Sequence, residues 1–428
     1  MSTEASPPGR AAFVFIFITV ALDMLALGII VPVLPRLIVS FEGGDVARAS
    51  AITGVFGTVW AAMQFVFSPI LGSLSDRYGR RPVILLSNLG LGLDYVLMAM
   101  AGSLPMLFLG RVISGITSSS FPTASAYIAD VTPEEKRAAQ FGMLSAAFGL
   151  GFVVGPAVGG WLGEHSLRLP FWVASGLSLA NALYGFFVLP ESLPPSRRAA
   201  FAWRNANPLG SLRLLRHSKA LVWLAVAAFV GAVGHEVFPS VYVLYTESRY
   251  RWSGRTVGIA LALVGVSSAL MGALGTGPLV KRLGEKKAYL FGMLVGTLGC
   301  LGHGLAPTGG WFLVSILVAA PMDVAMPSLS ALMTREVDAR AQGQLQGAVS
   351  ALRGISGMLG PVLFTQCFSW AIRHGGLGLR GLPFIVAAGL FGVAGVIGYR
   401  AAARAEASVL EGRTHEPDAV SVSREPVL

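Results

Sequence analysis

Residues 12–34 read AFVFIFITVALDMLALGIIVPVL, an apolar run in which Asp23 is the only charged residue. A helix crosses the hydrocarbon core of a bilayer with roughly 20 apolar residues, so this run is long enough for one crossing. The 428-residue chain contains about a dozen runs of this kind. Because a chain that crosses lipid has to satisfy its own backbone hydrogen bonds, the sequence predicts an all-α membrane protein with twelve transmembrane helices.

The expected spans are long, apolar and poor in charge. They cover residues 12–34, 51–73, 83–101, 105–129, 139–162, 170–189, 220–245, 256–279, 288–305, 311–332, 344–370 and 382–402. A polar central loop at 190–219 divides them into an N-terminal six-helix bundle, 12–189, and a C-terminal six-helix bundle, 220–402. We expect residues 1–11 to form a cytoplasmic N-terminus and the polar residues 403–428 to form a disordered cytoplasmic tail.

The bulk composition and the charge distribution agree with this interpretation. Hydrophobic residues make up 54% of the chain and charged residues 13%, whereas about 25% of residues are charged in a soluble domain. Of the 32 lysines and arginines, 22 fall on one side of the predicted spans and 8 on the other. By the positive-inside rule, both termini and the central loop lie in the cytoplasm, as in a bacterial inner-membrane protein. The chain has no soluble basic domain, which argues against a nucleic-acid partner despite the net charge of +10.

Two motifs recur at the same spacing. GSLSDRYGRR at 72–81 follows the second span, and GPLVKRLGEK at 277–286 follows the eighth. The pair Gly155-Pro156 in the fifth span recurs as Gly360-Pro361 in the eleventh, and both repeats are offset by 205 residues. Two unrelated motifs with one offset indicate a duplicated six-helix unit. Duplicated units of this kind bind their substrate between the halves, near the middle of the membrane.

The loop after the second span has the composition of a gate. In GSLSDRYGRRP, residues 72–82, the glycines Gly72 and Gly79 allow close packing and a tight turn. The acid Asp76 stands beside three arginines, Arg77, Arg80 and Arg81, and could lock one conformation by pairing with an arginine or a helix N-terminus. Simple topology would explain the arginines, but it explains neither the acid nor the glycines.

The fifth span contains a glycine repeat. Gly151, Gly155 and Gly159 recur every four residues and therefore lie on one helix face, which can approach another helix closely. Pro156 adds a bend that neighbouring groups must compensate. The pattern alone does not separate a packing seam from a moving hinge.

Ionisable residues inside spans are the remaining signal. A charge at the bilayer centre costs at least ~2.5–3.5 kcal/mol, so such residues are functional candidates by default. They are Asp23, Asp94, Arg111, Glu236, Asp323 and Arg353. A buried carboxylate near an arginine can load and release a proton as its surroundings change; the alternative is a static ion pair that only specifies packing. Cys300 and Cys367 lie in apolar runs, and neither a disulfide framework, a metal site nor an enzymatic nucleophile is indicated.

The motifs resemble those of the major facilitator superfamily, and in particular of its proton-coupled drug antiporters. The signatures are LDMLALGIIVPVLP at 22–35, GSLSDRYGRRP at 72–82, LFLGRVISGIT at 107–117 and GLGFVVGPAVGG at 149–160. YVLYTESRYRW at 242–252 and GQLQGAVSALRGISGMLGPVLF at 343–364 resemble the bacterial tetracycline/proton antiporters more narrowly. The resemblance extends from about residue 15 to residue 370.

This resemblance implies a role for each candidate. Asp23 and Asp94 would be essential carboxylates, and Arg111 would couple proton movement. Asp76, Arg77 and Arg81, together with the glycines and Pro156, would gate the cytoplasmic side. Gln64 and Asp94 would contact the substrate. We expect Arg353 to contact it as well, at a position where such pumps usually have an uncharged residue. The implied protein is a monomer in the lipid bilayer that exchanges protons for a small molecule, needs no cofactor and moves tetracycline as a divalent-metal chelate.

One departure concerns the second half. Tetracycline pumps place an essential aspartate in the ninth span, where this chain has Gly296 and no acid. We expect Asp323 or Glu236 to replace the missing carboxylate, balanced by Arg353. The rearrangement leaves open an exporter of another drug or natural product, and a metabolite importer on the same fold is a further alternative. A non-transporting membrane receptor is the remote one.

Overall fold

The computed structural model describes residues 10–118, 120–201, 203, 207–338 and 341–414, and regular secondary structure in these residues is helical. The helices of the first half are α1 Arg10–Ile30, α2 Leu34–Phe41, α3 Val46–Tyr78, α4 Arg80–Ala99, α5 Leu104–Thr117, α6 Ser120–Val131, α7 Glu134–His165 and α8 Leu169–Val188. Two 3₁₀ turns, η1 Pro195–Arg197 and η2 Gly210–Arg216, lie in the connection to the second half.

The second half contains more interrupted helices. Its elements are α9 Lys219–His235, α10 Val237–Tyr250, α11 Gly254–Leu270, the π-helical turn η3 Met271–Gly275, α12 Thr276–Leu283, α13 Glu285–Leu305, α14 Gly309–Ala319, η4 Ala320–Val324, α15 Ala325–Thr334, α16 Gln342–His374, η6 Leu377–Gly381 and α17 Leu382–Thr414. Helix α17 continues twelve residues past the expected start of the tail, while residues 1–9 and 415–428 lie outside the described part of the chain.

Eleven helical stretches in the described residues are long and apolar enough to cross a membrane. The remaining expected span, 105–129, is formed by α5 and α6, whose 14 and 12 residues are each too few for a crossing. Helix α5 ends at Thr117 with Ser118 as its C-cap, and α6 begins at Ser120. The all-helical membrane fold predicted from the apolar runs is therefore confirmed.

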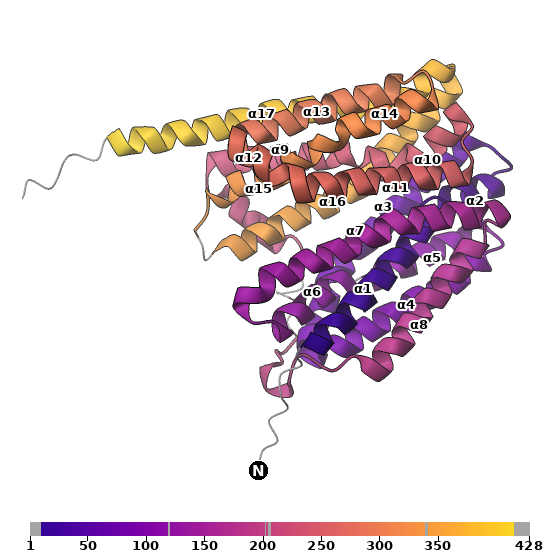
Figure 1. Ribbon diagram of the computed structural model, residues 1–428, viewed down its shortest axis with the longest axis horizontal. Coiled ribbons are helices and arrows are strands. Elements are labelled where there is room, and N and C mark those ends of the chain that lie inside the picture. The colour runs from indigo at the N-terminus through magenta and orange to yellow at the C-terminus, as the bar shows by residue number, and fades with distance from the viewer. Residues whose placement is uncertain (1–9, 119, 202, 204–206, 339–340, 415–428) are drawn as a thin grey trace, which may run out of the picture.

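The helices form two bundles that lie side by side (Figure 1). Helices α1–α8 form one bundle and α9–α17 the other, and each has its own buried apolar core. The bundles contact each other chiefly through α3 with α16 and through α7 with α11. Near one end of the molecule these pairs are close, and toward the end where α1 begins and α17 finishes the bundles diverge.

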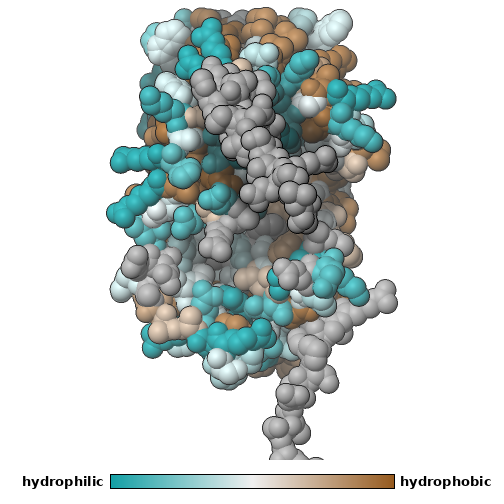
Figure 2. Space-filling model, turned by 90° about the vertical axis from the view of Figure 1, so that its left-hand side faces the viewer, coloured by the Kyte–Doolittle hydropathy of each residue, from teal (hydrophilic) through white to brown (hydrophobic). Residues whose placement is uncertain are grey.

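The diverging end is hollow. Figure 2 looks onto it and shows the surface recessed between the two bundles. Glycines near this end of the interface helices have no atom within 4 Å of an added Cβ; they are Gly72, Gly142, Gly149, Gly277 and Gly343. At the opposite end the equivalent position on Gly54, Gly160 or Gly258 would lie within 2.3 Å of an atom of the other bundle. The structure is therefore closed at one end and open at the end predicted to face the cytoplasm.

Local sequence signals explain where several helices begin. Asp45 accepts a hydrogen bond from the backbone N–H of Arg48 at 3.0 Å and caps α3. Ser218 caps α9 in the same way through the N–H of Leu221. Gly79 has a φ of 108°, which favours glycine, and this residue separates α3 from α4. The tight turn expected at the loop after the second span is thus placed at Gly79.

Candidate functional site

Asp23, in the middle of the first span, is buried among side-chain amides and is 3% exposed. Asn181 Nδ2, from α8, donates to Asp23 Oδ1 and to the carbonyl oxygen of Thr19, each at 2.9 Å. Asn88, from α4, lies with its amide group against the carboxylate; in the orientation that satisfies both groups its nitrogen donates to Asp23, 3.2 Å from Oδ1 and 3.0 Å from Oδ2. Hydrogen bonds from these donors offset the loss of hydration that burial imposes on the carboxylate.

Neither asparagine was among the residues predicted from the sequence. Both are completely buried, and both lie within apolar spans. Their signal in the sequence is weak, because an uncharged amide in a transmembrane helix is also common as a packing contact between helices. The structure distinguishes these two by their shared partner, Asp23.

Asp94 and Arg111 form a second buried group next to the first. Asp94 on α4 is 1% exposed and Arg111 on α5 is 8% exposed. The Arg111 guanidinium lies 5.2 Å from the ring centre of Trp60 and interacts electrostatically with Asp94. Tyr95 interacts electrostatically with Asp94, Arg111 and Asp23 together. The three predicted residues of the first half therefore come together from three different helices.

Helix α7 joins this group to the interface between the bundles. On one face, an added Cβ on Gly151, Gly155 or Gly159 would lie between 2.0 and 2.6 Å from atoms of α1, the helix that carries Asp23. On another face, the carbonyl oxygen of Pro156 lies against Gly258 of α11, where an added Cβ would be 2.3 Å away. The glycine repeat is thus a close contact within one bundle, and the proline next to it touches the other bundle.

We expect Gly155→Ala to destabilise the protein, because the new methyl group would lie 2.6 Å from Gly28 Cα, a backbone atom that cannot turn away. Overpacking of this kind costs roughly 1–3 kcal/mol. The check is the midpoint of thermal unfolding in detergent, which should fall by several degrees. Gly149→Ala in the same helix is the matched control, since no atom lies within 4 Å of its added Cβ. Equal midpoints for the two variants would contradict the packing argument.

The loop after the second span forms a charged network inside the first bundle. Asp76 pairs with Arg80 at 2.5 Å, and Arg80 also pairs with Asp130 of α6 at 3.1 Å. Glu191, just beyond α8, accepts hydrogen bonds from the backbone N–H groups of Arg80 and Arg81 at the start of α4. A carboxylate at a helix N-terminus is stabilised by the helix dipole as well as by these bonds.

The predicted gate residues occupy different places in this network. Asp76 pairs with Arg80 and not with Arg77 or Arg81. Arg77 is exposed with its guanidinium over the ring of Tyr78, and Arg81 donates to the carbonyl oxygen of Phe186 at 2.5 Å. Gly72 packs against nothing within 4 Å of an added Cβ, so the close contact expected there is absent in this conformation.

Two of the charged residues of the second half, Glu236 and Asp323, lie where its helices are interrupted, whereas Arg353 lies within the continuous helix α16. Glu236 separates α9 from α10 and packs against Gly360 of α16. Asp323 lies in η4, and Arg353 is exposed on α16. Asp323 and Arg353 both interact electrostatically with the exposed His235. Broken helices near the membrane midplane are a common setting for substrate sites.

The next two positions are Gln64, predicted to contact the substrate, and Gly296, the ninth-span position that lacks an acid. Gln64 Nε2 on α3 donates to the carbonyl oxygen of Ser118 at 3.3 Å, at the point where α5 ends. Gly296 on α13 is buried, and an added Cβ would lie 3.5 Å from Met322 Cβ. Met322 immediately precedes Asp323. Asp323, the acid of the tenth span, therefore directly follows Met322, the residue that packs on Gly296.

Comparison with known proteins gives consistent matches. Residues 16–361 match the sequence profile of the Major Facilitator Superfamily. The chain is 39% identical to "Tetracycline resistance protein, class C" of Escherichia coli, over 89% of this chain and 94% of that protein. It is 34% identical to the class B protein of Escherichia coli, over 85% of this chain and 90% of that protein.

Solved structures share the fold at lower sequence identity. The nucleoside transporter NupG has a TM-score of 0.76 at 14% identity, covering 92% of this chain and 99% of its own. A bacterial homologue of the lysosomal transporter Spinster, in an inward-facing and unoccupied conformation, has a TM-score of 0.73 at 17% identity, covering 93% of this chain and 98% of its own.

Proposed function

The chain belongs to the Major Facilitator Superfamily, and on this premise we propose that it exports a drug-like amphipathic compound in exchange for protons. That it is a multi-pass membrane transporter follows from the family and the fold. The observation that carries the proposal is the buried group of Asp23, Asp94 and Arg111, which joins two carboxylates and one cation inside the membrane spans. Such groups mark proton pathways in transporters.

The proposed cycle uses the conformation described above as its inward-open state. Substrate enters from the cytoplasmic end, and a proton bound by a carboxylate of the buried group is released. A substrate or proton shifts the equilibrium between the inward-open and outward-open states only if it binds the two states with different affinity. Helix α7 supplies a physical link, because it packs on α1 beside Asp23 and touches α11 through Pro156. A change at Asp23 can thereby reach the interface at which the bundles move.

The second half contributes its own carboxylate in this proposal. Asp323 is adjacent to the residue that packs on Gly296, and Glu236 faces Gly357 and Gly360 of α16. We expect the double variant Glu236→Gln/Asp323→Asn to lose proton-driven export, by at least about tenfold, since a proton-transfer group contributes ~10²-fold or more. Drug accumulation in everted membrane vesicles measures this. The control double variant Glu42→Gln/Asp45→Asn removes two acids at the closed end and should export normally. Full export by the first double variant would exclude both residues.

Two substrate candidates follow from the named relatives and from the changed positions of charged residues in the second half. Tetracycline is the first candidate because the chain is 34–39% identical to several tetracycline resistance proteins. A different drug is the second candidate, favoured by the absence of an acid at Gly296. Divalent metal would arrive with a chelating substrate as cargo. The described residues hold no group of three or more His, Cys, Asp or Glu side chains that could bind a metal ion.

A susceptibility screen tests the exporter proposal and the substrate. The wild type and Asp23→Asn would be expressed in an efflux-deficient bacterium and compared across tetracyclines and unrelated drugs. Protection by the wild type alone against at least one compound is expected. No protection against any compound would contradict export and favour the importer alternative. Protection against other drugs but not against tetracyclines would show that the substrate is a different drug. We further propose an inner-membrane monomer with both termini in the cytoplasm.

A further inference from the structure

The closed end of the molecule contains polar contacts that cross between the bundles. Ser50 Oγ on α3 donates to the carbonyl oxygen of Thr365 on α16 at 3.1 Å. On the other side of the interface, an added Cβ on Gly160 of α7 would lie 2.2 Å from the carbonyl oxygen of Gly254 at the start of α11. The two backbones therefore touch at this point, and charged side chains surround it.

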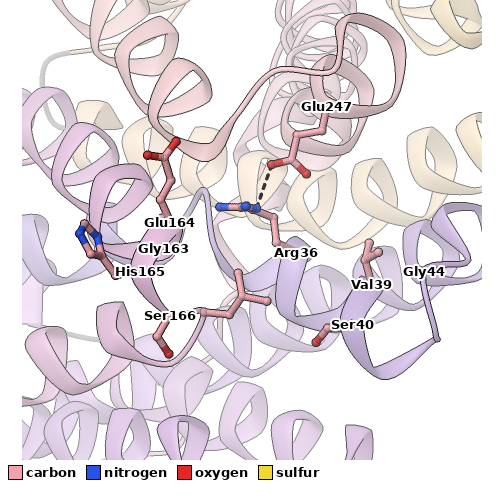
Figure 3. A pocket seen from close by; sticks show the side chains of 10 residues that line it. Arg36, Val39, Ser40, Gly44, Gly163, Glu164, His165, Ser166 and Glu247 are labelled. Atoms are coloured by element: carbon pink, nitrogen blue, oxygen red, sulfur yellow. Dashed lines mark ion pairs between the residues drawn. The ribbon is translucent and has the colours of Figure 1, made fainter.

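Arg36 and Glu247 form an ion pair between the bundles. Arg36 Nε on α2 lies 3.0 Å from Glu247 Oε1 on α10, and both side chains are less than a quarter exposed. Figure 3 shows Arg36 reaching from the first bundle to Glu247 in the second. The Arg36 Nη1 atom fills the space over Gly254, where an added Cβ would be 2.2 Å away. The other five ion pairs found between described residues each lie within one bundle.

Glu164 makes a second polar contact between the bundles, and here the acid belongs to the first bundle. It lies one residue before the end of α7, and its Oε1 accepts a hydrogen bond at 3.0 Å from the backbone N–H of Arg255 in the first turn of α11. The free N–H groups and the dipole of a helix N-terminus favour a carboxylate at this position. Glu164, Arg36 and Glu247 all line one cavity of about 500 Å³ at the closed end (Figure 3).

We propose that Arg36, Glu247 and Glu164 form an outer latch, which holds the inward-open state and has to separate before substrate can leave. Each bundle contributes one end of every contact, so any opening between α7 and α11 or between α2 and α10 stretches both crossings. The latch shifts the equilibrium between the inward-open and outward-open states, and its residues do not touch the buried group of Asp23, Asp94 and Arg111. This inference rests on the proposed alternating-access function.

The test measures opening of the outer side directly. A cysteine is placed at the fully buried Ser50 in a Cys300→Ala/Cys367→Ser background, and its reaction with a membrane-impermeant maleimide is timed in intact cells. The parent should react slowly because Ser50 lies in the closed interface. Glu247→Gln and Arg36→Gln should each speed labelling roughly fivefold, which corresponds to about 1 kcal/mol for one ion pair. Glu164→Gln should also speed labelling.

A double-mutant cycle separates the latch from general damage. If the pair acts as a unit, Arg36→Gln/Glu247→Gln should label no faster than either single variant. The matched control is Glu42→Gln, which breaks the ion pair with Arg48 that lies inside one bundle at the same end of the molecule. Its labelling rate should equal that of the parent.

The latch is overturned if both single variants label at the parent rate, or if their effects simply add in the double variant. Drug protection is measured in the same strains. Faster labelling without any wild-type drug protection would leave the latch standing and reject the exporter proposal. Drug protection by the wild type together with unchanged labelling in the latch variants would support the exporter proposal and reject the latch.

Discussion

Asp23→Asn is expected to abolish export while leaving the protein folded in the membrane. The substitution keeps the size of the side chain and removes the only group at this position that can bind and release a proton. Asn88 can turn its amide to present its oxygen to the new amide nitrogen, and Asn181 can continue to donate to the new amide oxygen. The fold is therefore preserved, and the loss of export, by about 100-fold or more, reflects the missing proton group.

Drug protection and membrane abundance measured in the same cells check this expectation. Asp45→Asn is a suitable control, because asparagine caps a helix as well as aspartate does and Asp45 caps α3 at the closed end. Export by Asp23→Asn above one tenth of the wild-type level would show that Asp23 is not the proton site. Loss of the protein from the membrane would instead show that the buried charge serves folding.

Arg111→Gln should have a comparable effect for a different reason. It leaves Asp94 buried without its nearby cation, and an uncompensated buried charge costs about 3 kcal/mol or more. We therefore expect both a lower thermal midpoint in detergent and no export. The guanidinium also loses its contact with Trp60. Arg111→Lys keeps the charge without the planar stacking surface and should fall between the wild type and Arg111→Gln.

The double variant Arg111→Gln/Asp94→Asn separates function from packing. With both charges removed, no isolated charge stays buried, so the thermal midpoint should recover toward that of the wild type. Export should remain absent, because the carboxylate that moves a proton is gone. Recovery of export together with stability would mean that Asp94 and Arg111 are a static pair that only specifies packing.

The sequence predicted the spans well because the bilayer allows few alternatives. A backbone in lipid has to be helical, so apolar runs such as 12–34 translate directly into helices. The same physics predicted Asp23, Asp94 and Arg111, since a charge in a span is costly and therefore conspicuous. Their meeting in one buried group depends on helix packing, which no local pattern encodes.

The amides and the inner network were harder to predict. Asn88 and Asn181 carry no charge, and nothing in their own spans points to a shared partner. The sequence places three arginines beside Asp76 and does not distinguish among them; in the structure the partner is Arg80, whose spacing of four residues is one that helical neighbours favour. Asp130 and Glu191 lie far from the loop in sequence, so only the fold brings them to Arg80.

The outer latch was missed for a related reason. Arg36 and Glu247 lie near the ends of their spans, where charged residues are common and need no special explanation. More than 200 residues separate them in the chain, so only the packing of the two bundles at this end brings them together. Contacts that change with conformation leave little trace in a single sequence.

Coupling of proton movement to export can be measured in everted membrane vesicles. Respiration acidifies the vesicle interior, and a dye reports the pH gradient after a substrate identified in the susceptibility screen is added. If protons drive export, substrate should make the interior less acidic in wild-type vesicles and have no such effect in Asp23→Asn vesicles. Substrate uptake that persists unchanged after a protonophore collapses the gradient would contradict this coupling.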